Sequence, residues 1–159
     1  MEDFQQFLIS LPFIEAFDED ENKLNVELNQ SLSESEIAKI CEDHQITLPK
    51  EYRIYLNHFY GGDLLGLNIE NLLEGIINSE DDNYIAFHNW GNGDFDCLKI
   101  TPNDFGTVAF LNHENGEMTQ IAKDFSEWLQ NAVLEIVEKG ALEHPMDMPT
   151  YGMYKSIEY

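Results

Sequence analysis

The chain has 159 residues, 43% of them hydrophobic and 12% aromatic, and its 31 acidic residues against 8 basic ones give a formal net charge of -23. This length suits one domain with its own core, and the hydrophobic fraction excludes the intrinsically disordered class despite the charge. The charge argues against direct binding to nucleic acids or anionic membranes, which need Lys and Arg. It has two explanations that the sequence leaves open, namely solubility or an acidic face that attracts a basic partner.

The N-terminal segment predicts a short helix from Glu2 to Leu11, an acidic loop, and a short strand from Lys23 to Leu28, where apolar residues alternate. It has no basic n-region, and the sequence has no apolar run of about 20 residues, so we predict neither a signal peptide nor a membrane span. Cys41 and Cys97 lack the spacing of a disulfide framework, which favours two reduced thiols. We therefore expect a cytoplasmic protein.

Two amphipathic helices are predicted next. Ser33 and Glu36 have the spacing of a capping box in front of the first helix. Pro49 suits the start of the second helix, and Gly61-Gly62 is expected to end it. The apolar residues that repeat at helical spacing are interpreted as core, and they are Ile37, Ile40, Cys41, Tyr52, Tyr55, Leu56 and Phe59.

In most of the segments that follow, apolar residues recur with the two-residue period of strands. Leu64 to Ile69 predicts a short strand, whereas Asn71 to Ile77 is ambiguous. Asn92-Gly93 and Asn115-Gly116 each separate two apolar runs, and Asn-Gly is the preferred sequence of type I′ hairpin turns. We therefore predict a four-stranded antiparallel meander with strands at Tyr84 to Trp90, Phe95 to Ile100, Thr107 to Asn112, and Met118 to Ile121.

A last helix is expected from about Asp124 to Lys139, with Glu127 at the capping-box position and Gly140 as its stop. The order of helices, sheet and packing helix predicts the α+β class, with an antiparallel sheet made of the four-stranded meander plus one or two N-terminal strands. No linker divides the chain, so we expect one domain over residues 1–159. Residues 141–159 are expected to form an irregular C-terminal tail, for which a strap over an exposed core face is the favoured role and a binding segment is the alternative.

The stretch HNWGNGDFDCLKI, residues 88–100, gathers residue types that carry chemistry. His88 and Asp94 could meet His113 across the meander, as a metal or acid–base site requires. The spacing matches no zinc motif, however, and the acids follow the glycine instead of preceding it as in a calcium loop. Turn chemistry explains residues 92–94 without catalysis, and no nucleophile elbow, HExxH or Walker sequence occurs. We expect no metal, no cofactor and no catalytic residue.

Three motifs occur in an order that resembles a known family. They are ITLPKEYRIYLNHFYGGDLLG, YIAFHNWGNGDFDCLKI and GTVAFLNHENGEMTQIAKDFSEWL. From Ser33 to Leu134 the chain resembles the SMI1/KNR4 family of the SUKH superfamily. The resemblance implies a SUKH-like α+β domain without catalytic residues. It also implies that bacterial relatives act as immunity proteins against a toxin, often a nuclease domain of a polymorphic toxin, and that fungal relatives act as regulators.

The resemblance and the charge favour a non-enzymatic immunity protein that binds a basic toxin domain, with neither nucleic acid nor membrane as a direct partner. Two alternatives stay open. The first is a regulatory interaction module with no toxin partner, and the second is a small hydrolase or metalloenzyme using His88, Asp94 and His113. Self-association also stays open, because the predicted sheet has uncovered edges.

The expected partner-binding residues are acids near the hairpins and one aromatic anchor. Trp90 is the expected anchor, because interface hot spots favour Trp and Tyr, and packing over the end of the sheet is its alternative interpretation. For each acid, a solvated surface position is the alternative interpretation. The acids are Asp63, Glu80, Asp81, Asp82, Asp94, Asp96, Glu114 and Glu117.

Overall fold

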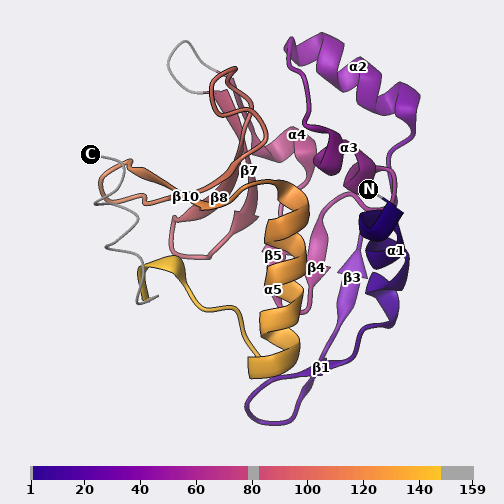
Figure 1. The fold of residues 1–159 in the computed structure, drawn as a ribbon, viewed down its shortest axis with the longest axis vertical. Coiled ribbons are helices and arrows are strands. Elements are labelled where there is room, and N and C mark those ends of the chain that lie inside the picture. Colours follow the sequence, from indigo (N-terminus) through magenta and orange to yellow (C-terminus); the bar gives the residue numbers. More distant parts are fainter. Residues whose placement is uncertain (1, 79–82, 148–159) are drawn as a thin grey trace.

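The computed structural model describes residues 2–78 and 83–147 of the chain (Figure 1). Its architecture is α+β, as predicted, with helices against one face of an antiparallel sheet. Within the described ranges, no helix has the length and apolar character that crossing a membrane requires. The helices are α1 (Glu2–Ser10), α2 (Glu34–His44), α3 (Lys50–Leu56), α4 (Leu72–Gly75) and α5 (Phe125–Lys139), with short 3₁₀ helices η1 (Leu11–Phe13) and η2 (Pro145–Asp147).

The main sheet has eight strands in the order β10-β9-β8-β7-β5-β4-β3, and β6 pairs with β7 beside this path. The last four strands form the predicted meander, and β3 is the N-terminal strand that joins the same sheet. The strands are β3 (Val26–Leu28), β4 (Gly62–Leu64), β5 (Leu67–Ile69), β6 (Ile76–Asn78), β7 (Asn83–Asn89), β8 (Phe95–Lys99), β9 (Val108–Leu111) and β10 (Met118–Ala122), while β1 (Ala16–Phe17) and β2 (Lys23–Leu24) form a separate hairpin.

Three hairpin turns lie at one end of the main sheet. Asn89, near the end of β7, pairs with Asn68 of β5 on one side and with Phe95 of β8 on the other. Because the pairing is antiparallel throughout, the β4–β5, β7–β8 and β9–β10 turns all project beyond this row of residues. We call this region the hairpin end, and it comprises residues 65–66, 90–94 and 112–117.

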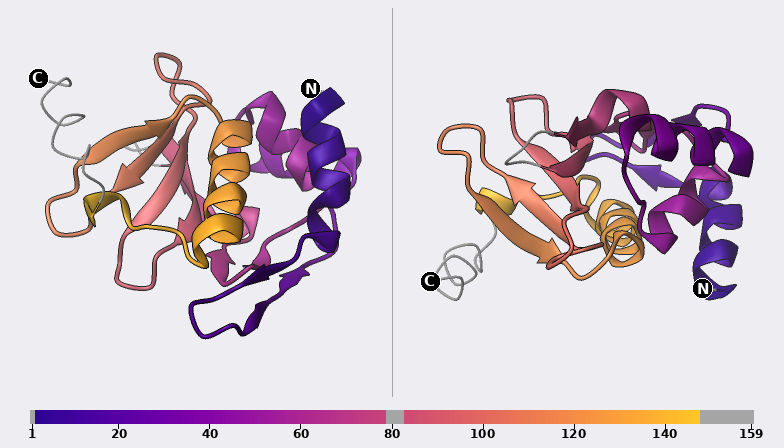
Figure 2. Two further views of the ribbon diagram at one scale, coloured as in Figure 1. Left: turned by 60° about the horizontal axis from the view of Figure 1, so that its bottom comes forward. Right: turned by 90° about the horizontal axis from the view of Figure 1, so that it is seen from above.

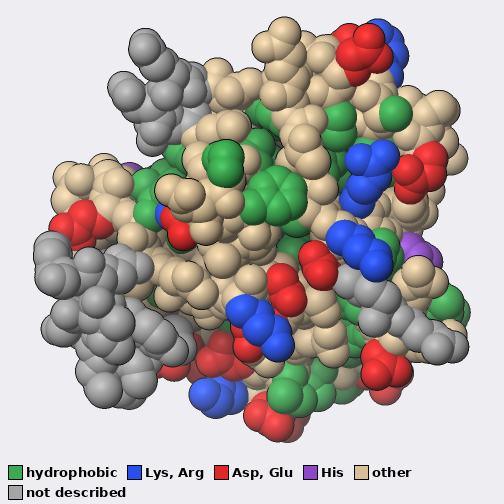
Figure 3. Space-filling model, turned by 45° about the horizontal axis from the view of Figure 1, so that its top comes forward, with side chains coloured by type: hydrophobic (Ala, Val, Ile, Leu, Met, Phe, Trp, Pro, Cys, Tyr) green, Lys and Arg blue, Asp and Glu red, His purple; other side chains and the backbone are tan. Residues whose placement is uncertain are grey.

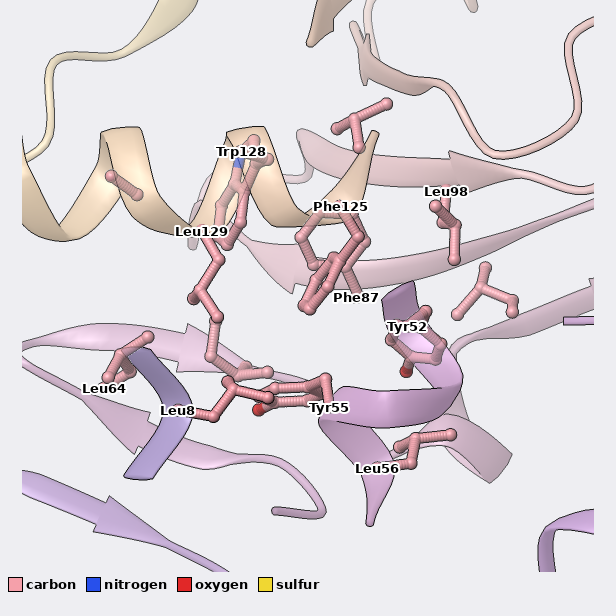
Figure 4. Close-up of a cluster of buried hydrophobic side chains, with 14 of the residues drawn as sticks. Leu8, Tyr52, Tyr55, Leu56, Leu64, Phe87, Leu98, Phe125, Trp128 and Leu129 are labelled. Carbon is pink, nitrogen blue, oxygen red and sulfur yellow. The ribbon is translucent and has the colours of Figure 1, made fainter. Parts of the chain in front are cut away.

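The core lies between the sheet and the helices α1, α3 and α5 (Figure 2). Phe125 of α5 is at its centre, with its ring edge-on to Tyr52 and Tyr55 at 5.0 Å and to Phe87 of β7 at 5.1 Å between centroids. Figure 4 shows Leu8 of α1 and the other labelled side chains of this cluster around these rings. The aromatic stripe of α3 is therefore core, as predicted, and the packing fixes α5 over the meander.

The predicted helix ends agree with the structure for α2 and α5. The Glu36 backbone N–H donates to Ser33 Oγ at 3.2 Å, and the Ser33 N–H donates to a Glu36 carboxylate oxygen at 3.1 Å, which completes the capping box. In α5 the Glu127 N–H donates to Asp124 Oδ1 at 2.8 Å, and Gly140 ends the helix with φ +82°.

The predicted end of the second helix at Gly61-Gly62 is wrong, since α3 ends at Leu56. Gly62 instead begins β4 and pairs with Leu28 of β3. A Cβ at Gly62 would lie 2.4 Å from the Glu27 carbonyl oxygen, so this glycine permits a close approach of two strands.

Two predicted single strands are each divided in the structure. The strand predicted from Lys23 to Leu28 breaks at Asn25, whose carbonyl accepts a hydrogen bond from the Leu65 N–H at 2.7 Å, and its halves join different sheets. The strand predicted from Leu64 to Ile69 is a hairpin, because Leu65 and Gly66 have φ values of +51° and +89° and form a tight turn.

The two Asn-Gly sequences do not form the predicted type I′ turns. Gly93 and Gly116 have positive φ, but Asn92 and Asn115 are not among the described residues with positive φ. The side chain of each asparagine accepts a hydrogen bond two residues ahead, from Asp94 N–H and Glu117 N–H respectively. These Asx turns extend both loops, so the β7–β8 and β9–β10 connections are longer than two-residue turns.

Candidate functional site

Two buried carboxylates, Asp94 of the hairpin end and Asp96 of the adjoining strand β8, have exposed fractions of 1% and 0%. The expectation that they are exposed interface acids is therefore wrong for both. The pairing of β7 with β8 shifts between Ala86 and His88, which places His88 opposite Asp96. Buried charges require several donors, and both carboxylates receive them.

Asp96 lies between the meander and α5 and accepts hydrogen bonds from three rings. Trp90 Nε1 donates to Oδ1 at 3.1 Å, and Trp128 Nε1 of α5 donates to Oδ2 at 3.1 Å. His88 Nδ1 is 2.8 Å from Oδ2, and it is the donor when Asp96 is ionised, because a carboxylate only accepts. These bonds fix both indole rings at the hairpin end.

Asp94 connects the β9–β10 turn to the C-terminal segment. His113 donates to Oδ1 through its backbone N–H at 2.9 Å and through its ring at 2.6 Å. His144 Nε2 donates to Oδ2 at 2.9 Å, and Asn92 Nδ2 donates to the same oxygen at 3.1 Å. Burial raises the pKa of Asp94, but these hydrogen bonds outweigh burial, so the pKa lies below its ordinary value and the carboxylate is ionised at neutral pH.

His144 was not identified from the sequence. It is 50 positions from Asp94, and no local spacing connects the two residues. Its ring lies edge-on between Trp90, at 4.8 Å, and Phe110, at 4.9 Å. The contact holds the start of the C-terminal tail against the hairpin end, and Pro145, the next residue, is buried. Residues 148–159 of the tail lie outside the described residues.

The structure divides the cluster that a catalytic or metal site would need. His88 binds Asp96, whereas His113 binds Asp94. In the portion of the chain that the structure describes, no group of three or more His, Cys, Asp or Glu side chains is arranged to hold a metal ion. Burial also raises the pKa of the Cys97 thiol, which keeps it protonated at neutral pH.

A groove of about 600 Å³ crosses the face of the meander that α5 does not cover, and we call it the open-face groove. Phe95, Leu111 and Met118 are cross-strand neighbours on its floor, where all three are half-buried. Glu70 and Glu74 lie on one side of it. An apolar floor with a charged rim is the usual composition of a protein-binding surface.

The predicted partner-binding residues fall into four groups. Asp63 and Glu114 are exposed, while Glu117 and Trp90 are half-buried. Asp63 continues the cross-strand row of the groove floor through Asn68 and Asn89. Gly93 and Gly116 line the groove, so the acids of the β9–β10 turn lie beside it. Asp94 and Asp96 are buried, and Glu80, Asp81 and Asp82 lie outside the described residues.

Glu70 and Glu74 were not identified from the sequence, because they flank or fall in the ambiguous segment from Asn71 to Ile77. That segment forms α4 and β6, and β6 pairs with the same edge of β7 that β5 uses farther along. On the face of the molecule that Figure 3 shows, the acidic side chains are not gathered in one patch. They are spread over the face of the molecule shown in Figure 3, among exposed hydrophobic side chains.

A family model described as SMI1 / KNR4 family (SUKH-1) matches residues 31–131. The match includes both buried aspartates, both tryptophans and the whole meander, and it ends within α5. His144 lies beyond it. A comparison with curated proteins finds no match.

Proposed function

The chain belongs to the SMI1/KNR4 (SUKH-1) family, which includes immunity proteins, and from this premise we propose that it is a non-enzymatic immunity protein that binds and neutralises a toxin domain. The proposed toxin is a basic nuclease domain of a polymorphic toxin system. The observation that carries the proposal is the net charge of -23 on a member of this family. A nuclease needs a basic cleft for its substrate, and an acidic protein complements that cleft and accelerates encounter.

The open-face groove and the adjoining hairpin end are the proposed binding surface. The groove offers apolar area for the centre of an interface, and Glu70 and Glu74 offer a rim that complements basic side chains. The exposed or half-buried acids Asp63, Glu114 and Glu117 extend that rim. Glu80, Asp81 and Asp82 stay candidates on sequence grounds. Asp94 and Asp96 act indirectly in this proposal, because they hold the turns and Trp90 in place.

The test is a binding and inhibition assay that takes the product of the neighbouring gene as the candidate toxin domain. The unmodified chain is expected to form a 1:1 complex that co-elutes on a sizing column and to abolish the nuclease activity. Glu74→Lys, on the groove rim, is compared with Glu42→Lys, on the exposed surface of α2. Both variants change the net charge equally, so the whole-molecule field is matched between them.

Glu74→Lys is expected to weaken the complex by about tenfold or more, since it places a like charge against a basic partner, whereas Glu42→Lys changes it much less. Equal effects of the two substitutions would contradict the location of the surface. No complex, with the toxin still active, would contradict the immunity function and favour a regulatory interaction module of the same family.

A further inference from the structure

We propose that a second cavity, on the opposite face of the meander from the groove, binds the cationic end of a Lys or Arg side chain of a basic partner. The inference rests on the proposed function, since it names the chemical group by which that partner is anchored. The cavity has a volume of about 140 Å³ and lies between α5 and the segment 142–145. We call it the tryptophan cavity, because Trp90 and Trp128 both line it.

The walls of the tryptophan cavity combine aromatic rings with carboxylates. Trp90 and Trp128 are the chain's two tryptophans, and Asp96, Glu135 and Glu143 line the same space. Tryptophan is the strongest aromatic partner for a cation, at ring distances within about 6 Å. Because both indole N–H groups donate to Asp96, the rings are held in place before any ligand enters. A preorganised aromatic pair loses little entropy on binding.

Among the described residues that line the cavity there are three carboxylates and no Lys or Arg. Asp96 is fully buried, and its donors are two neutral indoles and His88. Across the described residues, the Lys and Arg ion pairs involve other carboxylates and none involves Asp96. Glu135 has only a long contact of 3.5 Å with the exposed Lys139, and Glu143 is exposed. A cation in the cavity would offset this negative charge where water is partly excluded.

The size of the cavity limits what it binds. Pockets for cofactors and drug-sized ligands have volumes of about 300–1,000 Å³, so a space of about 140 Å³ suits one side chain. A neutral apolar side chain would bring no opposite charge to Glu135 and Glu143, whereas Asp96 already accepts three hydrogen bonds. An alkylammonium or guanidinium group at the end of an apolar stem satisfies both the rings and the acids.

The position of the cavity agrees with a partner at the hairpin end. Asp96 and Phe95 are consecutive residues of β8, so their side chains point to opposite faces of the sheet. Phe95 lines the open-face groove, and Asp96 lines the tryptophan cavity. A partner that straddles the hairpin end would therefore contact the groove with one segment and the cavity with another. Leu142 and Glu143, which complete the cavity, lie beyond the residues that match the family model.

The test uses the full chain alone and follows the indole N–H signals by NMR. Only two such signals exist, and both come from the cavity. The chain is titrated with N-acetyl-lysine methylamide and with methylguanidinium at constant ionic strength, and with N-acetyl-norleucine methylamide as the neutral control. Saturable shifts of both indole signals are expected with the two cations. The neutral compound is expected to give none.

Two double variants separate the cavity from the general charge. Glu135→Gln with Glu143→Gln is expected to weaken cation binding about fivefold or more, because it removes two cavity carboxylates. Glu42→Gln with Glu138→Gln makes the same charge change at exposed positions and should leave binding unchanged. Equal responses to cationic and neutral compounds, or equal effects of the two double variants, would overturn the inference. Since no toxin is present, this result is independent of whether the immunity function holds.

Discussion

Asp94 and Asp96 are two positions apart, yet they connect different parts of the molecule. Asp96 joins the meander to α5 through the Trp128 indole, and Asp94 joins the β9–β10 turn to the C-terminal segment through His113 and His144. Removing one donor of a buried carboxylate costs stability, because it leaves the charge less well compensated. Through Asp96, the placement of Trp90 depends on Trp128 of α5. Through Asp94, the placement of the hairpin turns depends on His113 and His144.

The lowered pKa of Asp94 predicts how its contribution depends on pH. The pKa in the folded state lies below the ordinary value of about 3.9, so the unfolded state takes up the proton first as pH falls. The contribution is complete above pH 5 and is lost as pH falls from about 4 through the lower folded pKa. We expect Asp94→Asn to cost about 1–3 kcal/mol at pH 7 and progressively less below pH 4.

Urea unfolding of the two proteins between pH 7 and pH 3 measures this difference. The difference between variants is the useful quantity, because acidification also relieves the repulsion among the many acids and changes both proteins. Glu42→Gln, at an exposed position of α2, serves as the control and should stay within about 0.5 kcal/mol. A cost for Asp94→Asn that does not change between pH 5 and pH 3 would contradict the assignment.

Sequence reasoning selected Asp94 and Asp96 but placed them on the surface. Turn chemistry explained the run at 92–94 locally, so nothing indicated that the carboxylates turn inward. Their burial depends on the irregular pairing at Ala86 and His88 and on a histidine from the C-terminal segment. Such long-range partners have no periodicity or spacing from which they can be predicted.

At the scale of elements, the features that the sequence predicted correctly are those that depend on residues close together in the chain. The capping box of α2 and the glycine stop of α5 satisfy backbone groups within a few residues, and both are present. The hairpin at Leu65-Gly66 and the division of the strand at Asn25 were not predicted. These features depend on which strands pair, and β3 meets β4 only after α2 and α3 have intervened.

The C-terminal end of α5 lies against β1 at Gly140, and a substitution there tests this contact. Gly140 has φ +82°, and a Cβ there would lie 2.9 Å from the Phe17 carbonyl oxygen of β1. Gly116 has a similar φ of +73° but has nothing within 4 Å of such a Cβ. Alanine at Gly116 is therefore expected to cost about 1–2 kcal/mol for the left-handed conformation alone.

Gly140→Ala is expected to cost more than Gly116→Ala, since it adds a clash with β1 to the same conformational cost. Denaturant unfolding of both variants measures the difference, which reports the contact between α5 and the β1–β2 hairpin. Equal costs would mean that this hairpin moves away without loss and does not stabilise the end of α5.

At the scale of the whole molecule, the net charge is expected to affect mainly the association rate of a basic partner, and specific contacts mainly its dissociation rate. The acids are spread over the face shown in Figure 3, so they act on a basic partner mainly as a summed field. Fields of this kind accelerate association and are screened over a Debye length of about 8 Å at physiological salt. The proposed contacts in the open-face groove and the tryptophan cavity would form only after docking, so they are expected to act mainly on dissociation.

Binding kinetics with the basic toxin domain at 50 mM and 500 mM salt test this separation. The association rate of the unmodified chain is expected to fall at least about tenfold across that range, while the dissociation rate changes much less. Glu135→Gln with Glu143→Gln should raise the dissociation rate, whereas Glu42→Gln with Glu138→Gln, with the same net charge, should not. An affinity that is flat with salt would mean that apolar contacts carry the complex. The net charge of -23 would then serve solubility alone.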